Sequence, residues 1–368
     1  MVAINTNVML SLGDVFSKVM SLDRVDYAVP SGAANIISDT NDRFHIATRT
    51  ADGYKTFGMT PYARGQFNDR WTGFNTFSKT LDKNGSTQIY LDTANALLAE
   101  DDRKMVLRTI EPDGERVARA VVSDAFKPID DNLLIPNMVE VIGDRGHEWR
   151  ALGGQVTDTN TFMRFITRQP QMSLNVNGRN REMHVGFQYS NSEVGRGFAQ
   201  FSAFFFDSFC ENGCVFGSLN VANVKHAHRG SRISTDFGQI FEERIQKAEL
   251  AQIQGAIVDA TRLAVEGTYV PEVKQLLERA LATEIPAESN EVKFIEEVAR
   301  RVGLTQAEQQ AALVEYDGTR SIYGVQAAIT ALAQKSKDFS RRAELEQAGG
   351  RVIQMDTKVW DSIATLCT

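Results

Sequence analysis

The strongest constraint on the fold is a change of pattern near residue 235. Before it, short runs with every second residue apolar flank turn pairs such as Asp52-Gly53 and Asn177-Gly178, which is typical of β-hairpins. After it, apolar residues recur every three to four positions, as in amphipathic helices. The pattern therefore predicts an α+β fold, with a β-hairpin-rich domain over residues 1–235 and an all-helical domain over residues 236–368.

Local signals place several elements in the first domain. A second hairpin is expected where two strand-like runs, MVLRTI and RVARAVVS, flank Pro112-Asp113-Gly114. A helix should begin at Pro61, because Thr60 is a good N-cap and proline is favoured at the first helical position. Helical spacing also indicates three further helices, at residues 8–20, 91–104 and 132–146.

The aromatic stretch from Phe198 to Phe209 leaves two alternatives open. Ala199, Phe201, Ala203, Phe205 and Phe209 lie on one parity, which favours a strand with one aromatic face. Phe198, Phe201, Phe205 and Phe209 also fit helical spacing, so a helix remains the alternative.

Five helices are expected in the second domain, over residues 236–265, 271–283, 289–302, 306–315 and 322–336. Thr305, with Glu308 three residues later, predicts a capping box at the start of the fourth. Gly349-Gly350 should end a sixth helix, over residues 339–348, because glycine is common just after a helix.

Composition limits the class of protein. Of the 368 residues, 42% are hydrophobic and 24% charged, which is enough for a sizeable core. No apolar run approaches 18 residues, so no membrane-spanning helix is expected. The three cysteines are an odd number, which argues against a disulfide framework and for a reducing compartment. The first twenty residues do not resemble a signal peptide, so a cytoplasmic location is predicted.

The charge is unevenly distributed along the chain. The formal net charge is −7, yet the segment from Arg145 to Arg232 holds ten Lys or Arg against six Asp or Glu. Such asymmetry indicates a surface for a polyanion. Basic side chains track phosphates and aromatic faces stack on unpaired bases. The candidate nucleic-acid-binding residues are Arg164, Arg168, Arg179, Arg181, Lys225, His228, Arg229 and Arg232. Arg164 and Arg168 would share a face if their stretch is helical, and Arg179 and Arg181 would point to the same side of a strand.

Other kinds of chemistry have weaker support in the sequence. Cys210 and Cys214, with His184, His226 and His228, could supply zinc ligands or a Cys–His pair, but the cysteine segment can equally be a turn with a small buried thiol. The paired acids Asp101-Asp102 and Asp130-Asp131 are interpreted as solvated turns or helix ends rather than as a two-metal site. No phosphate-binding glycine-rich loop of the Walker type is present. The sequence therefore predicts neither an enzyme nor a bound cofactor or metal.

Four segments resemble the phage/plasmid-like protein family described as domain of unknown function 932. They are Thr60–Phe67; Leu107–Thr109 with Arg119–Asp124 and Ile129-Asp130; His184–Gly186 with Asn191–Gly195; and Phe209–Gly213 with Lys225–His228. The likeness covers about residues 55–235. Members of the family occur in phages, prophages and plasmids, and they look distantly similar to ring-forming single-strand annealing proteins, whose core is a curved β-sheet backed by a helix.

This resemblance implies a curved antiparallel sheet in the first domain and a protein of the host-cell cytoplasm that takes part in phage DNA recombination. The expected function is ATP-independent binding and annealing of single-stranded DNA, by a homo-oligomer. The alternative is a phage- or plasmid-encoded protein-interaction factor that acts on a host target, in counter-defence or regulation, and is not an enzyme. A third hypothesis, the least favoured, is an enzyme that uses His184, Cys210 or Cys214.

Overall fold

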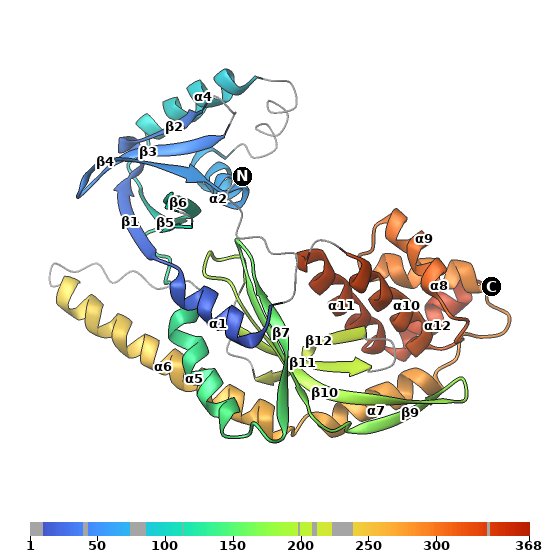
Figure 1. Cartoon of the computed structure of the whole chain (residues 1–368). Helices are drawn as coiled ribbons and strands as arrows, with labels where there is room; N and C mark the ends of the chain where they lie inside the picture. Colours follow the sequence, from blue (N-terminus) through green and yellow to red (C-terminus); the bar gives the residue numbers. More distant parts are fainter. Residues whose placement is uncertain are drawn as a thin grey trace.

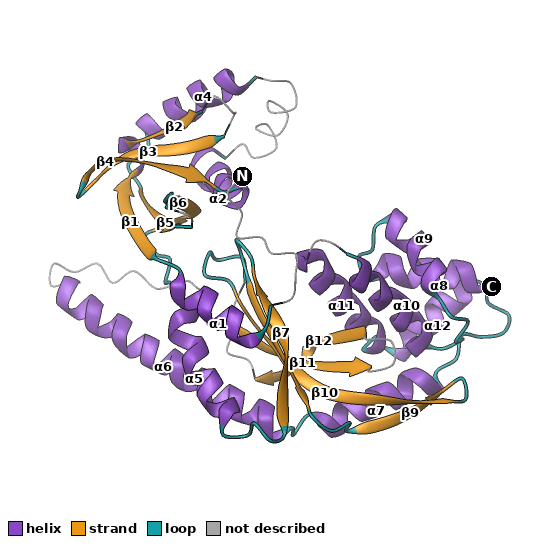
Figure 2. Cartoon of the chain, viewed as in Figure 1, coloured by secondary structure: helices purple, strands orange, loops and turns teal. Residues whose placement is uncertain are grey.

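The computed structural model contains two β-sheets with helices packed around them (Figures 1 and 2). It describes residues 10–368, except 40–42, 74–85, 113, 198, 208–211, 223–237 and 337–338. Within these residues, strands and helices are interspersed up to Ala222, and the named elements after it are all helices. This order confirms the predicted α+β class with a helical C-terminal part.

The first sheet is built from the strands before residue 124. In spatial order they are β1 (Arg24–Pro30), β5 (Lys104–Ile110), β6 (Val117–Ser123), β4 (Gly53–Met59), β3 (Phe44–Thr50) and β2 (Ala34–Ser38). Both predicted hairpins, β3–β4 and β5–β6, are present. One pair differs from the antiparallel prediction, since β4 and β6 run parallel. The helices between β4 and β5 supply the longer crossover that parallel pairing requires.

Two helices cover this sheet, α2 (Pro61–Phe67) and α4 (Thr87–Ala99). The predicted start of α2 is confirmed, because the Thr60 hydroxyl accepts a hydrogen bond from the Ala63 N–H at 3.1 Å. From α4, the Asn95 amide bonds the backbone N–H and C=O of Ile36 at 2.7 and 2.9 Å. Asn95 thereby occupies part of the free edge of β2, which would otherwise be open to pairing with another strand.

The second sheet is antiparallel throughout. In spatial order its strands are β12 (Asn212–Ala222), β11 (Gln200–Asp207), β10 (Arg179–Asn191), β8 (Thr161–Thr167) and β7 (Trp149–Val156), while β9 (Met172–Val176) pairs with the first part of β10. The predicted turn Asn177-Gly178 joins β9 to β10. Its two residues have φ of 51° and 76°, the positive values that a tight hairpin turn of this type requires.

The aromatic stretch forms strand β11, which decides between the strand and the helix. It does not have one aromatic face, because Phe201 and Phe205 point to one side and Phe204 to the other, and all three are buried. Both faces are covered by helices. On the Phe201 side lie α1 (Leu12–Ser21), α5 (Asp131–Gly143) and α6 (Gly238–Glu266). The opposite face packs against α11 (Phe339–Ile353).

The C-terminal helices follow the predicted pattern closely. The five expected helices correspond to α6, α7 (Val270–Ala282), α8 (Glu291–Arg301), α9 (Gln306–Glu315) and α10 (Ile322–Lys335). The capping box of Thr305 and Glu308 is formed. The prediction for the sixth helix was wrong, because α11 continues through Gly349-Gly350. A Cβ at Gly350 would lie 2.1 Å from the Val215 carbonyl oxygen, so the glycine permits close packing on β12. A further helix, α12 (Thr357–Leu366), was not predicted.

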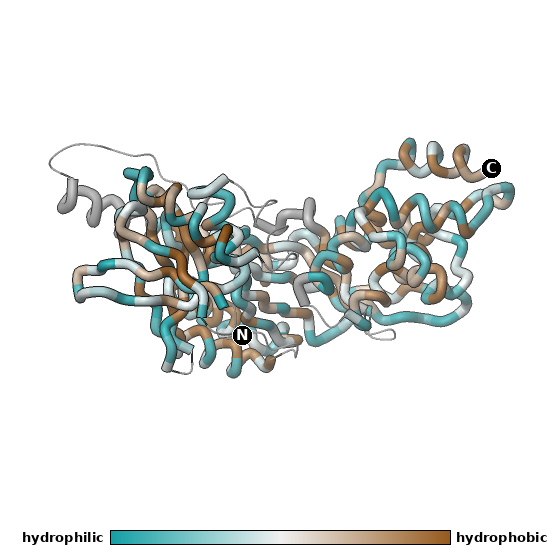
Figure 3. Tube along the Cα trace, turned by 90° about the horizontal axis from the view of Figure 1, so that it is seen from above, coloured by the Kyte–Doolittle hydropathy of each residue, from teal (hydrophilic) through white to brown (hydrophobic). Residues whose placement is uncertain are grey.

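The hydrophobic core does not divide at residue 235. Phe205 and Phe216 of the second sheet belong to the same buried cluster as Leu277, Ile329 and Trp360 of the helices. The first sheet has its own cluster with α2 and α4. Figure 3 shows hydrophobic positions recurring along the C-terminal helices, in keeping with their shared interior. We refer below to the first sheet with α2 and α4 as the first lobe, and to the second sheet with its helices as the second lobe.

Candidate functional site

Arg164 was predicted to contact nucleic acid, and the structure corrects this prediction. It lies on strand β8 rather than on a helix, and it is 2% exposed. Its guanidinium pairs with Glu346 of α11 and donates to Gln188 Oε1 at 2.8 Å. Because the group is enclosed and paired with a buried carboxylate, it fastens α11 to the sheet and does not face a phosphate.

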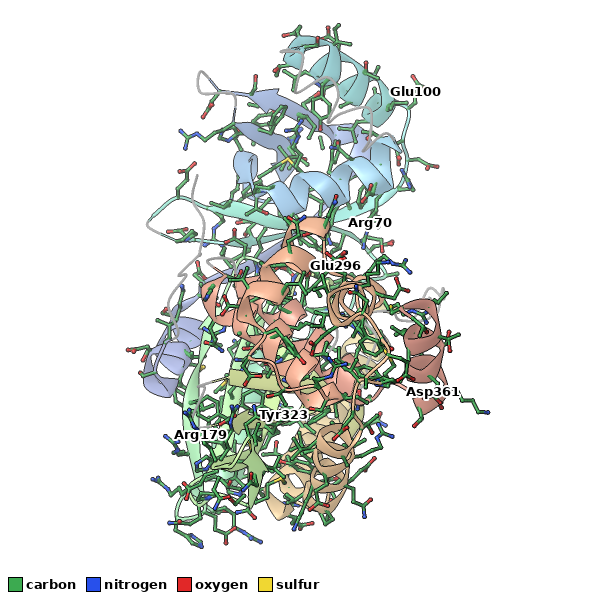
Figure 4. All side chains as sticks on the ribbon, turned by 90° about the vertical axis from the view of Figure 1, so that its right-hand side faces the viewer. Arg70, Glu100, Arg179, Glu296, Tyr323 and Asp361 are labelled. Carbon is green, nitrogen blue, oxygen red and sulfur yellow. The ribbon has the colours of Figure 1, made fainter. Side chains whose placement is uncertain are left out.

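Arg181 requires the same correction. It pairs with Asp207 at 3.3 Å and with Asp317 at 3.6 Å, and Asp207 also accepts the hydroxyl of Tyr323 at 3.0 Å. Tyr323 lies on α10, which brings the C-terminal helices over this part of β10 (Figure 4). Arg179 has the same parity on the strand but stays exposed at the hairpin end.

The exposed candidates among the described residues are Arg168 and Arg179. Arg168 follows β8, and its Nε donates to the Gly146 carbonyl at 2.8 Å. The adjoining loop carries exposed Arg145 and His147, which both pair with Glu148. The remaining candidates lie outside the described residues; they are Lys225, His228, Arg229 and Arg232.

The candidate enzyme and metal ligands are buried where they are described. His184 Nδ1 lies 2.8 Å from the Thr167 carbonyl oxygen. Cys214 is fully buried, and burial raises the pKa of its thiol well above the ordinary value, so the sulfur stays protonated. Cys210, His226 and His228 lie outside the described residues. Within the described part of the chain, no three His, Cys, Asp or Glu side chains gather in a way that could hold a metal ion.

A buried ionic junction joins the two lobes, and sequence reasoning missed it. At its centre is Glu193, in the loop after β10, which is 4% exposed. Its carboxylate pairs with Arg24 of β1 at 2.8 Å and with Arg119 of β6. It also accepts the backbone N–H of Asp131 at 2.8 Å, at the start of α5. One side chain of the second lobe therefore bonds two strands of the first and a helix end.

Arg108 of β5 forms the other half of the junction. It is 1% exposed and pairs with Asp130 at 2.8 Å and with Asp26 at 3.1 Å. It also donates to the backbone carbonyl of Glu193. The interpretation of Asp130-Asp131 as a solvated helix end was therefore wrong. Asp131 is 1% exposed, and the Asp130 carboxylate bonds a buried arginine.

The junction separates the pKa values of its acids. Burial, together with repulsion from Glu193, raises the pKa of Asp131 to about 6. Burial also opposes ionisation of Glu193, but Arg119 and Arg24 outweigh it and lower the pKa of that carboxyl to about 2. Asp131 Oδ1 accepts the Tyr189 hydroxyl at 2.7 Å and the Asn191 amide at 3.0 Å. Asp131 is thus the member of this pair that gains a proton first as the pH falls.

The sequence contained one usable signal for this junction. Asn191–Gly195 recurs in the family resemblance, and it places an acid inside a short turn between two strands. An acid in such a place is exposed unless a cation lies opposite. The arginines that meet it are 169 and 74 residues away in the chain. Their approach depends on the packing of the two lobes, which local patterns do not describe.

Comparison with known proteins adds no assignment. A scan against models of protein families found no match, and a search of curated proteins found none either. Among the described residues, no helix is long and apolar enough to cross a membrane.

Proposed function

We propose that this protein binds single-stranded DNA through basic side chains of the second lobe and promotes strand annealing without ATP, as a homo-oligomer. The supporting observation is the exposure of Arg168 and Arg179 at the margins of the second sheet. The excess of basic residues from Arg145 to Arg232 supports the same reading, as does the family resemblance. Phosphate contact by such residues requires no covalent chemistry.

The proposal excludes Arg164 and Arg181 from the DNA-binding set, because both are paired with buried carboxylates. Their role is to hold the C-terminal helices on the sheet. The second lobe then presents basic groups at two places, near the loop at residues 144–148 and at the β9–β10 turn. The four basic candidates between Lys225 and Arg232 complete the set.

The test is fluorescence anisotropy of a labelled single-stranded oligonucleotide at several salt concentrations, on protein whose mass is measured by light scattering. Salt-sensitive binding by an oligomer, with ATP-free annealing of complementary strands, would support the proposal. The double variant Arg168→Gln/Arg179→Gln should reduce the slope of log affinity against log salt by about two, since each lost phosphate contact reduces it by about one. Arg300→Gln, an exposed arginine on α8, is the matched control. No binding at micromolar protein would refute the proposal.

A second candidate is a protein-interaction factor that acts on a host target. Three apolar side chains are largely exposed on separate C-terminal helices: Val314 on α9 (82%), Leu366 on α12 (68%) and Val292 on α8 (53%). Exposed apolar groups can serve partner binding when they gather on one face. Recovery of a stoichiometric host protein by the wild-type chain, but not by Val314→Ser/Leu366→Ser, together with no DNA binding, would favour this candidate.

A further inference from the structure

One polar face of α2 meets the loop that follows β10. Tyr62, Gln66 and Arg70 are spaced by four residues along α2 and its continuation, the π-helical turn η2 (Asn68–Thr72). Residues at this spacing lie near one another on a helix. The Gln66 amide fixes the face, because it donates to the Val194 carbonyl at 2.8 Å and accepts the Val121 N–H at 3.1 Å.

The loop contributes a further arginine to this place. The backbone N–H of Arg196 donates to the Ser192 hydroxyl at 2.9 Å, and its guanidinium reaches the Thr159 hydroxyl at 3.3 Å. These bonds hold Arg196 beside the point where the two lobes meet. Its side chain remains partly exposed.

Tyr62 lies between these elements with its ring partly open to solvent. One side packs on a small buried cluster with Ala120, Val122 and Val194. Burial raises the pKa of the Tyr62 hydroxyl, whereas Arg196 and Arg70 act in the opposite direction and lower it. The two guanidinium groups are therefore near enough to make the potential at the hydroxyl positive.

We propose that Tyr62, Arg70 and Arg196 form a second binding site for single-stranded DNA, at the boundary between the lobes. The Tyr62 ring stacks on a base, and the two arginines contact the flanking phosphates. A partly open aromatic ring between two cations is the combination that single-stranded nucleic acids recognise, because each nucleotide offers a π-face and a negative charge. This inference rests on the proposed function and extends the binding surface to the first lobe.

The site is separate from the basic groups of the second sheet. Arg70 and Arg179 lie in different parts of the molecule (Figure 4). A bound strand would then contact the protein at two places, one on each lobe, and removal of either set should leave the other to bind. The two sets can therefore be tested independently.

The experiment measures anisotropy with a labelled oligodeoxynucleotide for the wild-type chain, Arg70→Gln/Arg196→Gln and Arg168→Gln/Arg179→Gln. The first double variant should reduce the salt slope by about two. Tyr62→Leu should weaken binding roughly 5- to 150-fold, the range for loss of one stacked base, while Tyr62→Phe retains affinity. Oligonucleotides with 5-iododeoxyuridine should crosslink to the peptide containing Tyr62. Unchanged thermal unfolding of each variant shows that folding is intact.

The outcomes separate this inference from the function on which it rests. Wild-type affinity and slope in Arg70→Gln/Arg196→Gln, with weakened binding in Arg168→Gln/Arg179→Gln, would overturn the second site and leave the proposed function standing. No binding by the wild-type chain would overturn both. A preference for RNA of the same sequence that disappears in Arg70→Gln/Arg196→Gln would reject DNA as the ligand of this site.

Discussion

Glu193 accepts a hydrogen bond at 2.8 Å from the backbone N–H of Asp131, so a carboxylate from the second sheet caps the first turn of α5. The residue at the N-cap position, Asp130, makes no side-chain cap and pairs with Arg108 instead. A negative charge is favourable at a helix N-terminus, where N–H groups lack partners within the helix. The cap of α5 and the joint between the lobes are therefore the same group.

Replacing Glu193 with glutamine should destabilise the protein by about 3–5 kcal/mol, because Arg24 and Arg119 would keep their charges in a buried place with no counter-ion. Chemical denaturation of the full chain measures this loss. Glu100→Gln, at an exposed position after α4 (Figure 4), should retain near-wild-type stability. Equal stability of the two variants would contradict a structural role for the junction.

Asp131 should make the protein less stable as the pH rises from acid to neutral. Its folded-state pKa of about 6 lies above the ordinary 3.8, so its contribution is full below the ordinary value and disappears as the pH passes 6. The loss should be about 2 kcal/mol between roughly pH 4.5 and 7. Glu193 has a lowered pKa of about 2, so its opposite contribution is already nearly complete in this range.

The measurement is the free energy of unfolding of the wild-type chain and of Asp131→Asn across this pH range. The asparagine variant cannot take up the proton, so the difference in stability between the two proteins should change by the amount stated for Asp131. A constant difference across the range would show that Asp131 has an ordinary pKa in the folded chain.

Signals confined to a few residues predicted the elements well. Thr60 before Pro61, Asn177-Gly178 and Thr305 with Glu308 each specify a hydrogen bond or a backbone angle that their neighbours cannot override, and all three are present. The helices after residue 235 followed from their spacing, because a helix packed on one side needs an apolar stripe. These features account for most of the fold class.

The candidate site was harder to predict because charge does not reveal burial. Arg164 appears in the sequence as one of several basic residues, and its counter-ion, Glu346, is 182 residues away. A buried arginine is tolerated only when such a partner is present, so its environment depends on how α11 docks on the sheet. The same holds for Arg181 with Asp207, and for Glu193 with its arginines.

Gly350 should be required for the docking of α11. Gly350→Ala would place a Cβ 2.1 Å from the Val215 carbonyl oxygen, which forces the helix away from β12 and should cost about 1–3 kcal/mol. Gly255→Ala is a matched control within α6, where an added Cβ meets nothing within 4 Å. Because alanine is the better helix former, this control should stabilise the chain by about 0.5–1 kcal/mol. Thermal unfolding of both variants should show shifts of opposite sign.

Arg164 and Arg168 should respond to substitution in different ways, although only four residues separate them. Arg164→Ala leaves Glu346 buried without its main partner and should cost about 3–5 kcal/mol. Arg168→Ala removes an exposed group whose Nε bonds a loop carbonyl, so stability should change little. The proposed function expects the opposite order for DNA binding: Arg168→Ala lowers the salt slope by about one, whereas folded Arg164→Ala keeps the wild-type slope. Denaturation and anisotropy on the same two preparations test both halves, and a lowered slope in folded Arg164→Ala would contradict its assignment as a structural residue.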